Sequence, residues 1–170
     1  MSNDKQFRIT IISTGGTIEK TYDEVAGSLA NQGSVLDRML ADLELPELEV
    51  TRVSLMNKDS LEMTQEDHDR IAEAVVGVTP GEDGVLVVHG TDRLAETGEC
   101  IHQRMESFSC PVVLTGAMRP YELRQTDALQ NLTESLMAIR LLGPGVWCVM
   151  HNKVLPFPGV KKNHKRMTFE

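Results

Sequence analysis

Residues 8–18 have the sequence RITIISTGGTI, a β-branched run followed at once by two threonines that flank a pair of glycines. Isoleucine and threonine favour extended backbone, so the run predicts a strand over residues 7–13. Glycine adopts backbone angles that other residues avoid, and Gly15 and Gly16 therefore predict a tight turn that a ligand can approach closely. Because ligands of open α/β sheets bind outside the carboxyl ends of the strands, this turn is a candidate site.

Strand and helix patterns alternate along the rest of the chain. We predict further strands at residues 48–55, 85–88, 111–114 and 146–150, and helices at 33–41, from Thr64 onward, after Asp92 and at 126–141. Thr64 and Asp67 have nearly the spacing and chemistry of a capping box at the start of the second helix. Strands separated by helices predict an α/β protein with a parallel sheet and right-handed crossovers, in a single domain of residues 1–170.

Two segments depart from that alternation. Residues 14–31 are long for a strand-to-helix connection, and we expect a mobile active-site loop there or, alternatively, a small hairpin. After the strand at 146–150 the pattern weakens. Pro156, Pro158 and Gly159 then predict that no further regular element forms.

The composition limits the partners and the compartment. A formal net charge of −8 over 170 residues argues against nucleic acid or an anionic membrane as the main partner. The basic stretch KKNHKR at 161–166 is expected to be solvated, although one of its lysines could serve a site. Three cysteines without metal-like spacing indicate free or buried thiols in a reducing compartment. No signal segment and no membrane-spanning run is evident, so the expected location is cytoplasmic.

A second strand end carries the sequence VLVVHGTD, at residues 85–92. The carboxyl ends of parallel strands meet at one edge of a sheet, so Thr91 and the threonines of the first turn are expected to share one crevice. A simpler interpretation is that Thr91 or Asp92 caps the helix that follows. His89 stands at the end of an apolar strand, and we expect a packed histidine there rather than a general base.

The first turn has three interpretations: a tight turn whose hydroxyls cap the backbone, a phosphate-binding turn, or a nucleophile site. The chain lacks both G-x-G-x-x-G and G-x-x-x-x-G-K-[ST] at this point, and residues 18–22 are expected to form a loop, which disfavours phosphate. A threonine hydroxyl attacks a carbonyl when a neighbour such as lysine or tyrosine takes its proton. Two threonine motifs at one crevice therefore favour an amidohydrolase.

Four stretches, taken together, resemble the bacterial-type asparaginase/glutaminase family. They occur in the family's order: TGGTI at 14–18, KDS at 58–60, VHGTDRLAET at 88–97 and TGAMRP at 115–120. The resemblance implies a doubly wound α/β fold with a flavodoxin-like parallel sheet sandwiched by helices. It also implies ping-pong hydrolysis of L-asparagine to L-aspartate and ammonia, with weak glutaminase activity as a secondary expectation. It implies no metal and no organic cofactor.

The same resemblance assigns catalytic roles to Thr17, Tyr22, Thr91, Asp92 and Lys162. Thr17 matches the nucleophile and Tyr22 the loop tyrosine that assists it, although Tyr22 lies closer to Thr17 than in longer members. Thr91, Asp92 and a downstream lysine match the second catalytic set. Lys162 has about the expected offset from the last strand, and Lys161 is the alternative.

Substrate-binding roles fall, by resemblance, on Gly16, Asp59, Ser60, Gly90, Thr91 and Asp92. Ser60 would hold the substrate carboxylate and Asp92 the substrate ammonium. Leu61 follows Ser60 where secreted members often have a polar residue, which predicts weaker or different recognition of the substrate backbone.

The chain is about half of the family's usual length, and the expectation is that it corresponds to the N-terminal domain without the smaller C-terminal domain. The resemblance implies a homo-oligomer, a dimer or a tetramer. Alternative functions are a non-catalytic asparagine- or aspartate-binding module, a subunit of an amidotransferase, or a fragment of a longer enzyme.

Overall fold

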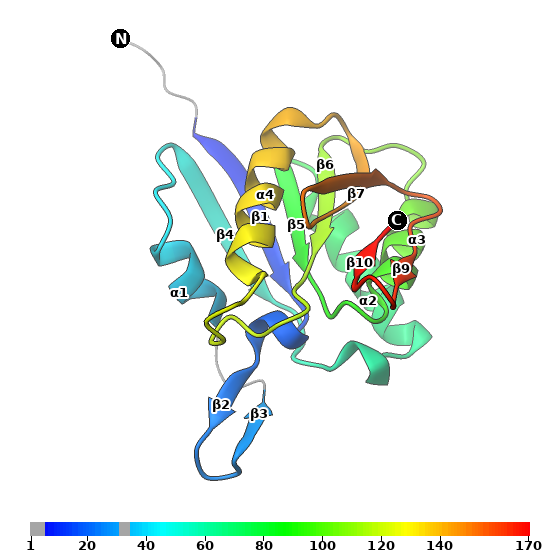
Figure 1. Ribbon diagram of the computed structural model, residues 1–170. Helices are drawn as coiled ribbons and strands as arrows, with labels where there is room; N and C mark the ends of the chain where they lie inside the picture. The colour runs from blue at the N-terminus through cyan, green and yellow to red at the C-terminus, as the bar shows by residue number, and fades with distance from the viewer. Residues whose placement is uncertain (1–5, 31–34) are drawn as a thin grey trace.

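A computed structural model describes residues 6–30 and 35–170, which form a six-stranded sheet with helices on both faces (Figure 1). The strands lie in the order β4 (Leu48–Ser54), β1 (Phe7–Ser13), β5 (Gly84–Val88), β6 (Pro111–Thr115), β7 (Gly145–Met150) and β8 (Lys153–Pro156). The first five strands are parallel and their order is that of the flavodoxin-like doubly wound fold. The predicted fold class is therefore confirmed.

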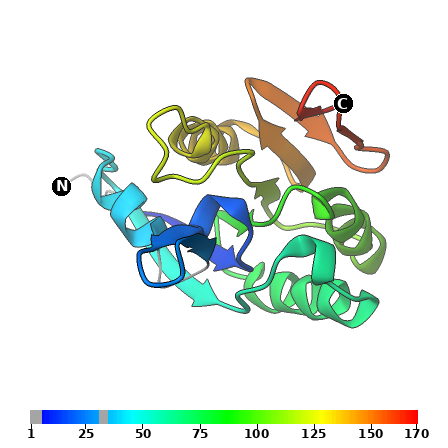
Figure 2. The ribbon, with the colours of Figure 1, turned by 60° about the horizontal axis from the view of Figure 1, so that its bottom comes forward.

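Two apolar layers fill the space between the sheet and the helices. One face is covered by α2 (Gln65–Val78) and α3 (Leu94–Arg104), the other by α1 (Val35–Ala41) and α4 (Ala128–Leu141) (Figure 2). Strand β5 contributes side chains to both layers, because successive side chains of a strand point to opposite faces. Val85 and Val87 pack in the first layer, whereas Leu86 and Val88 pack in the second.

The start of α2 is the capping box that the sequence predicts. The Thr64 hydroxyl accepts a hydrogen bond from the Asp67 N–H, and the Asp67 carboxylate accepts one from the Thr64 N–H. The start of α3 is different. Its N-cap residue is Arg93, which makes no side-chain cap bond, so the prediction that Thr91 or Asp92 caps this helix is wrong.

The segment after residue 150 contains strands that the sequence did not predict. His151 and Asn152 have φ values of 53° and 58°, and this left-handed turn reverses the chain so that β8 pairs antiparallel with β7. The sheet is therefore parallel except for the edge strand β8, and the expectation of no element after residue 150 is wrong. Two short strands, β9 (Lys162–Asn163) and β10 (Thr168–Phe169), then pair with each other.

The long connection after β1 holds a single 3₁₀ turn, η1 (Thr17–Glu19), where a loop was expected. It continues into a hairpin of β2 (Thr21–Asp23) and β3 (Ser28–Ala30), which was the alternative prediction for this segment. The hairpin projects from the body of the domain at the edge where the parallel strands end (Figure 1). Residue 31 and the predicted start of the helix at 33–34 lie outside the described residues.

Candidate active site

The two glycine motifs and the Ser60 loop meet at the carboxyl edge of the sheet. Gly16 has φ 87°, and a Cβ atom placed on it would lie 2.5 Å from the Cα atom of Gly90. A Cβ atom on Gly90 would in turn lie 2.5 Å from the Ser60 Oγ atom. Only a residue without a side chain permits these approaches. The predicted convergence of the two strand ends at one edge of the sheet is therefore confirmed.

The two threonines of the first turn have different environments. The Thr14 hydroxyl is buried and donates a hydrogen bond to the Val88 carbonyl at 3.0 Å, so it joins β1 to β5. The Thr17 side chain is half-buried and its hydroxyl has no hydrogen-bond partner among residues 6–30 and 35–170. Thr14 is consequently a structural residue, whereas the Thr17 hydroxyl remains available to a ligand.

Lys162 lies beside the second motif. Its Nζ atom donates hydrogen bonds to Thr91 Oγ1 at 2.8 Å and to Asp92 Oδ1 at 2.7 Å. The Lys162 side chain is 8% exposed and Thr91 is buried, so this contact is largely shielded from solvent. Lys161 is exposed, and its backbone pairs with that of Glu170. Of the two candidate lysines, Lys162 is the one placed beside Thr91 and Asp92.

The loop around Ser60 is fixed by hydrogen bonds of its own. Ser60 is buried at the start of η2 (Ser60–Glu62), and the Asp59 side chain caps this turn by accepting from the Leu61 N–H. Lys20 Nζ donates to the other Asp59 oxygen at 3.0 Å. The Leu61 N–H and then Lys20 lower the pKa of Asp59 below its ordinary value. The structure thus directs the Asp59 carboxylate into contacts within the protein, and its assigned contact with substrate stays a prediction.

A buried histidine pair lies behind Gly90. His89 Nδ1 is 2.7 Å from the Gly90 carbonyl and must donate, which leaves His89 Nε2 to accept from the Thr97 hydroxyl at 2.8 Å. The Thr97 oxygen then accepts from His68 Nδ1 at 2.7 Å. Burial lowers the pKa of His89 to about 4, so its ring is neutral at physiological pH. The expectation of a packed histidine is confirmed.

Tyr22 belongs to the projecting hairpin. Its side chain is 57% exposed, its hydroxyl has no hydrogen bond to any residue of the described ranges, and its backbone N–H donates to the Glu122 carboxylate at 2.7 Å. This placement leaves Tyr22 without a hydrogen bond to Thr17. Its assisting role stays a prediction.

Some residues of the site were not predicted from the sequence. Glu19 is buried two residues after Thr17, where burial raises its pKa above the ordinary value. The Lys20–Asp59 ion pair joins the first turn to the Ser60 loop. Neither Glu19 nor Lys20 belongs to a stretch with a recognisable motif, and only their position near Thr17 in the chain could have drawn attention to them.

The described residues contain no group of three histidine, cysteine, aspartate or glutamate side chains arranged to hold a metal ion. No helix among them has both the length and the apolar character needed to cross a membrane. The three cysteines are free thiols, and burial raises the pKa of Cys110 to about 11 and that of Cys148 to about 12.

The family model named "Asparaginase, N-terminal" matches residues 8–169. The chain is 28% identical over 157 residues to the L-asparaginase of Thermococcus kodakarensis, covering 92% of this chain and 48% of that protein. The solved structure of that thermostable L-asparaginase superposes with a TM-score of 0.85 at 29% identity, over 93% of this chain and 48% of the other.

A second kind of relative is a glutamyl-tRNA(Gln) amidotransferase subunit from Methanosphaera stadtmanae. It is 30% identical over 140 residues, which cover 81% of this chain and 32% of the relative. The chain therefore spans about half the length of the matched asparaginase and about a third of this amidotransferase subunit.

Proposed function

Because the chain belongs to the family of the asparaginase N-terminal domain, we propose that it is an amidohydrolase that converts L-asparagine to L-aspartate and ammonia. The observation that carries the proposal is the arrangement at the carboxyl edge of the sheet. Thr17, whose hydroxyl has no partner among the described residues, follows Gly16, and Gly16 packs on Gly90. Gly90 in turn precedes the cluster of Thr91, Asp92 and Lys162.

In the first half-reaction the Thr17 oxygen attacks the carboxamide carbon of the substrate. The hydroxyl proton has to leave as the new C–O bond forms, and a threonine is a weak nucleophile unless a neighbour accepts that proton. We assign this task to Tyr22 on closure of the hairpin, with the Thr91–Lys162 pair as the alternative acceptor. Backbone N–H groups of the glycine turns would stabilise the oxyanion. The C–N bond then breaks, the nitrogen leaves as ammonia with the transferred proton, and an aspartyl ester of Thr17 remains.

In the second half-reaction water attacks the ester carbon. We assign the transfer of a proton from that water toward Lys162 to Thr91, because the Thr91 oxygen already accepts a hydrogen bond from Lys162 Nζ. Loss of a proton from the ammonium of Lys162 would let this pair act as a base. The ester C–O bond breaks, Thr17 regains its proton, and L-aspartate leaves. This order of steps is the ping-pong scheme.

The substrate backbone is assigned to Ser60 and Asp92. The Asp92 side chain is 34% exposed and only one of its oxygens bonds Lys162, which leaves the other carboxylate oxygen for the substrate ammonium. Gly16 and Gly90 would contribute backbone contacts, since nothing extends from either Cα atom. Leu61 is 63% exposed and its side chain offers no hydrogen bond, in keeping with weaker recognition on that side.

One alternative to the enzyme is a non-catalytic module that binds asparagine or aspartate. The second candidate function is a subunit of an amidotransferase. The similarity to a glutamyl-tRNA(Gln) amidotransferase subunit, at 30% identity, favours it. An amidotransferase subunit would release ammonia from an amide only together with a partner chain. A binding module would bind the amino acid without needing the Thr17 hydroxyl at all.

The deciding experiment is ammonia release from L-asparagine and L-glutamine by the purified 170-residue chain and by Thr17→Ala. We expect turnover of asparagine that disappears in the variant, with both proteins giving the same circular dichroism. Glutamine differs by one methylene, which changes the specificity by about 10–200-fold. A folded wild-type chain that binds asparagine by calorimetry but releases no ammonia would replace the proposal with the binding module.

Two further assignments belong to the proposal. The three free cysteines suit a reducing compartment such as the cytoplasm. A homo-oligomer, dimer or tetramer, is proposed from the family resemblance, and light scattering on the purified chain measures it directly.

A further inference from the structure

The lysine of the candidate site is carried by a very short strand, and this strand needs support. Strand β9 consists of Lys162 and Asn163 only, and its pairing partner is β10, in which Phe169 faces Lys162 and Thr168 faces Asn163. The pairing continues at residue 161, where the backbone N–H and carbonyl of Lys161 both bond to Glu170. An isolated two-residue ladder has little stability of its own. The position of Lys162 therefore depends on what holds β10.

One support of β10 is apolar. Phe169 is 1% exposed and belongs to the core layer that α2 and α3 cover. Lys153 Nζ, from β8, donates to the Phe169 carbonyl at 3.0 Å. These contacts anchor Phe169 of β10 in the core. They do not involve the side chain of Thr168, the other residue of β10.

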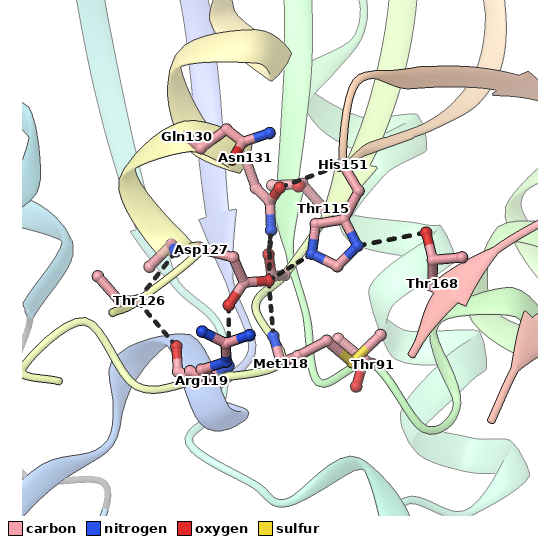
Figure 3. Close-up of polar contacts among 12 residues, drawn as sticks. Thr91, Thr115, Met118, Arg119, Thr126, Asp127, Gln130, Asn131, His151 and Thr168 are labelled. Atoms are coloured by element: carbon pink, nitrogen blue, oxygen red, sulfur yellow. Dashed lines mark hydrogen bonds and ion pairs between the residues drawn. The ribbon is translucent and has the colours of Figure 1, made fainter. Parts of the chain in front are cut away.

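The other support is a chain of polar contacts from Thr168 (Figure 3). The Thr168 hydroxyl lies 3.2 Å from His151 Nδ1, and His151 Nε2 lies 2.7 Å from Asp127 Oδ2. His151 stands in the turn between β7 and β8, and Asp127 stands directly before α4. Three elements that are distant in sequence are thus joined through one imidazole ring.

The direction of these hydrogen bonds follows from Asp127. Its carboxylate accepts from the backbone N–H groups of Met118 at 3.0 Å and Arg119 at 2.9 Å, and from Asn131 Nδ2 at 3.0 Å. Burial raises the pKa of Asp127, but the hydrogen bonds from Met118, His151 and Arg119 outweigh it and lower the pKa overall. An ionised carboxylate only accepts, so His151 donates from Nε2. The Nδ1 atom on the other side of the ring is left for the hydrogen bond with the Thr168 hydroxyl.

The same aspartate also holds the 115–120 stretch, which lies beside Thr91. Met118 and Arg119 belong to the 115–120 stretch that resembles the family, and Asn131 of α4 donates to the Gly116 carbonyl at 2.9 Å. A Cβ atom on Gly116 would lie 3.2 Å from Thr91 Cγ2, so this stretch packs against the threonine that Lys162 contacts. The stretch beside Thr91 and the strand that carries Lys162 are therefore both tied to one carboxylate.

We propose that the Asp127–His151–Thr168 chain is a positioning element that holds Lys162 against Thr91 and Asp92. None of the three residues is assigned a contact with substrate. They act through β10 and its pairing with β9. The catalytic consequence rests on the proposed function, because it matters to turnover only if Lys162 takes part in amide hydrolysis.

The test compares Thr168→Val, which keeps the shape of the side chain and removes the hydroxyl, with Thr168→Ser, which keeps the hydroxyl. Acetylation of lysine amines under limiting reagent, followed by peptide mass spectrometry, measures the accessibility of Lys162 with the exposed Lys161 as internal reference. Loss of one hydrogen bond is expected to speed labelling of Lys162 relative to Lys161 about tenfold in Thr168→Val, with little change in Thr168→Ser. On asparagine, kcat should fall about as much in Thr168→Val while KM changes less than about twofold.

The labelling result is independent of the reaction. Unchanged labelling in Thr168→Val, or an equal rise in Thr168→Ser, would overturn the positioning role. If labelling changes as expected but the wild-type chain hydrolyses no amide, the positioning role stands and the proposed function fails. His151→Leu removes both imidazole hydrogen bonds from a different element and is expected to give the same labelling change, which covers the case in which Thr168→Val does not fold.

Discussion

The Nζ atom of Lys162 lies 2.8 Å from the hydroxyl of Thr91, across 71 residues of sequence. The same nitrogen lies 2.7 Å from Asp92, so one buried ammonium is shared by the two residues that follow Gly90. This contact explains why neither Thr91 nor Asp92 caps α3. Their side-chain oxygens turn toward the lysine instead of toward the first N–H groups of the helix.

Replacing Lys162 by methionine should abolish most of the activity. Methionine keeps much of the apolar stem but removes the donor to Thr91, and loss of a general acid–base group typically costs about 10²–10⁴ in rate. Steady-state ammonia release measures the change. Lys161→Met is the matched control, since Lys161 is exposed and should tolerate the change. A severe loss in Lys161→Met with a nearly unaffected Lys162→Met would reverse the assignment.

The two threonines of the first turn should separate stability from activity. Thr14→Val removes a buried hydrogen bond to the Val88 carbonyl, which still accepts from the Thr14 backbone N–H, and is expected to lower the free energy of unfolding by about 0.5–1.5 kcal/mol. Thr17→Val should leave the unfolding free energy within about 0.5 kcal/mol of wild type and eliminate turnover. Urea denaturation and ammonia release are measured on both variants. Full activity in Thr17→Val would remove Thr17 as the nucleophile.

Gly16→Ala should damage both the fold and the site. The added Cβ would lie 2.5 Å from the Gly90 Cα atom, and φ 87° is unfavourable for alanine. The backbone strain alone is expected to cost about 1–3 kcal/mol of unfolding free energy, and the displaced crevice should lose activity. Gly77→Ala is the control, because nothing lies within 4 Å of its Cβ position in α2. There alanine should stabilise by about 0.5–1 kcal/mol. Equal stability of the two variants would contradict the close packing of Gly16.

His89 should make the stability depend on pH. Burial lowers its pKa from 6.5 to about 4, so between these values the unfolded chain binds a proton that the native chain excludes. The free energy of unfolding should therefore fall as the pH is lowered through this window, by at most about 1.4 kcal/mol per unit. Denaturation curves at about pH 7 and about pH 5, on either side of the unfolded pKa, should show a smaller loss for His89→Gln than for wild type. Burial also lowers the pKa of His68, so the contribution of His68 to the pH dependence of stability remains in His89→Gln.

Identical losses of stability in wild type and His89→Gln would show that His89 is not the group responsible. The variant also removes the hydrogen bond to the Gly90 carbonyl, so its stability at neutral pH is expected to be lower from the start. The comparison therefore uses the difference between the two pH values within each protein.

The sequence alone determined the parallel core of this protein. Strands such as β5, buried on both faces, are recognisable as short apolar runs, and α2 begins at a capping box made of residues three apart. These signals are local, because hydrophobic periodicity and capping depend on neighbours along the chain. The same local patterns located both threonine motifs at strand ends, and the order of a doubly wound sheet then brings them to one edge.

The tertiary structure alone decided what the local patterns left open. Lys161 and Lys162 are adjacent and identical in type, and only the pairing of β9 with β10 directs Lys162 to Thr91 while Lys161 faces solvent. Strands β8 to β10 are too short for a periodic signal. Each pairs with a strand only a few residues away, but contacts with more distant segments, such as Phe169 in the core and Thr168 on His151, hold the β9–β10 pair in place. Likewise Thr91 and Asp92 have good capping chemistry, yet Thr91 Oγ1 and one Asp92 oxygen accept hydrogen bonds from a lysine 71 and 70 residues away. Contacts between distant segments depend on the folded backbone, and so they could not be predicted from spacing along the chain.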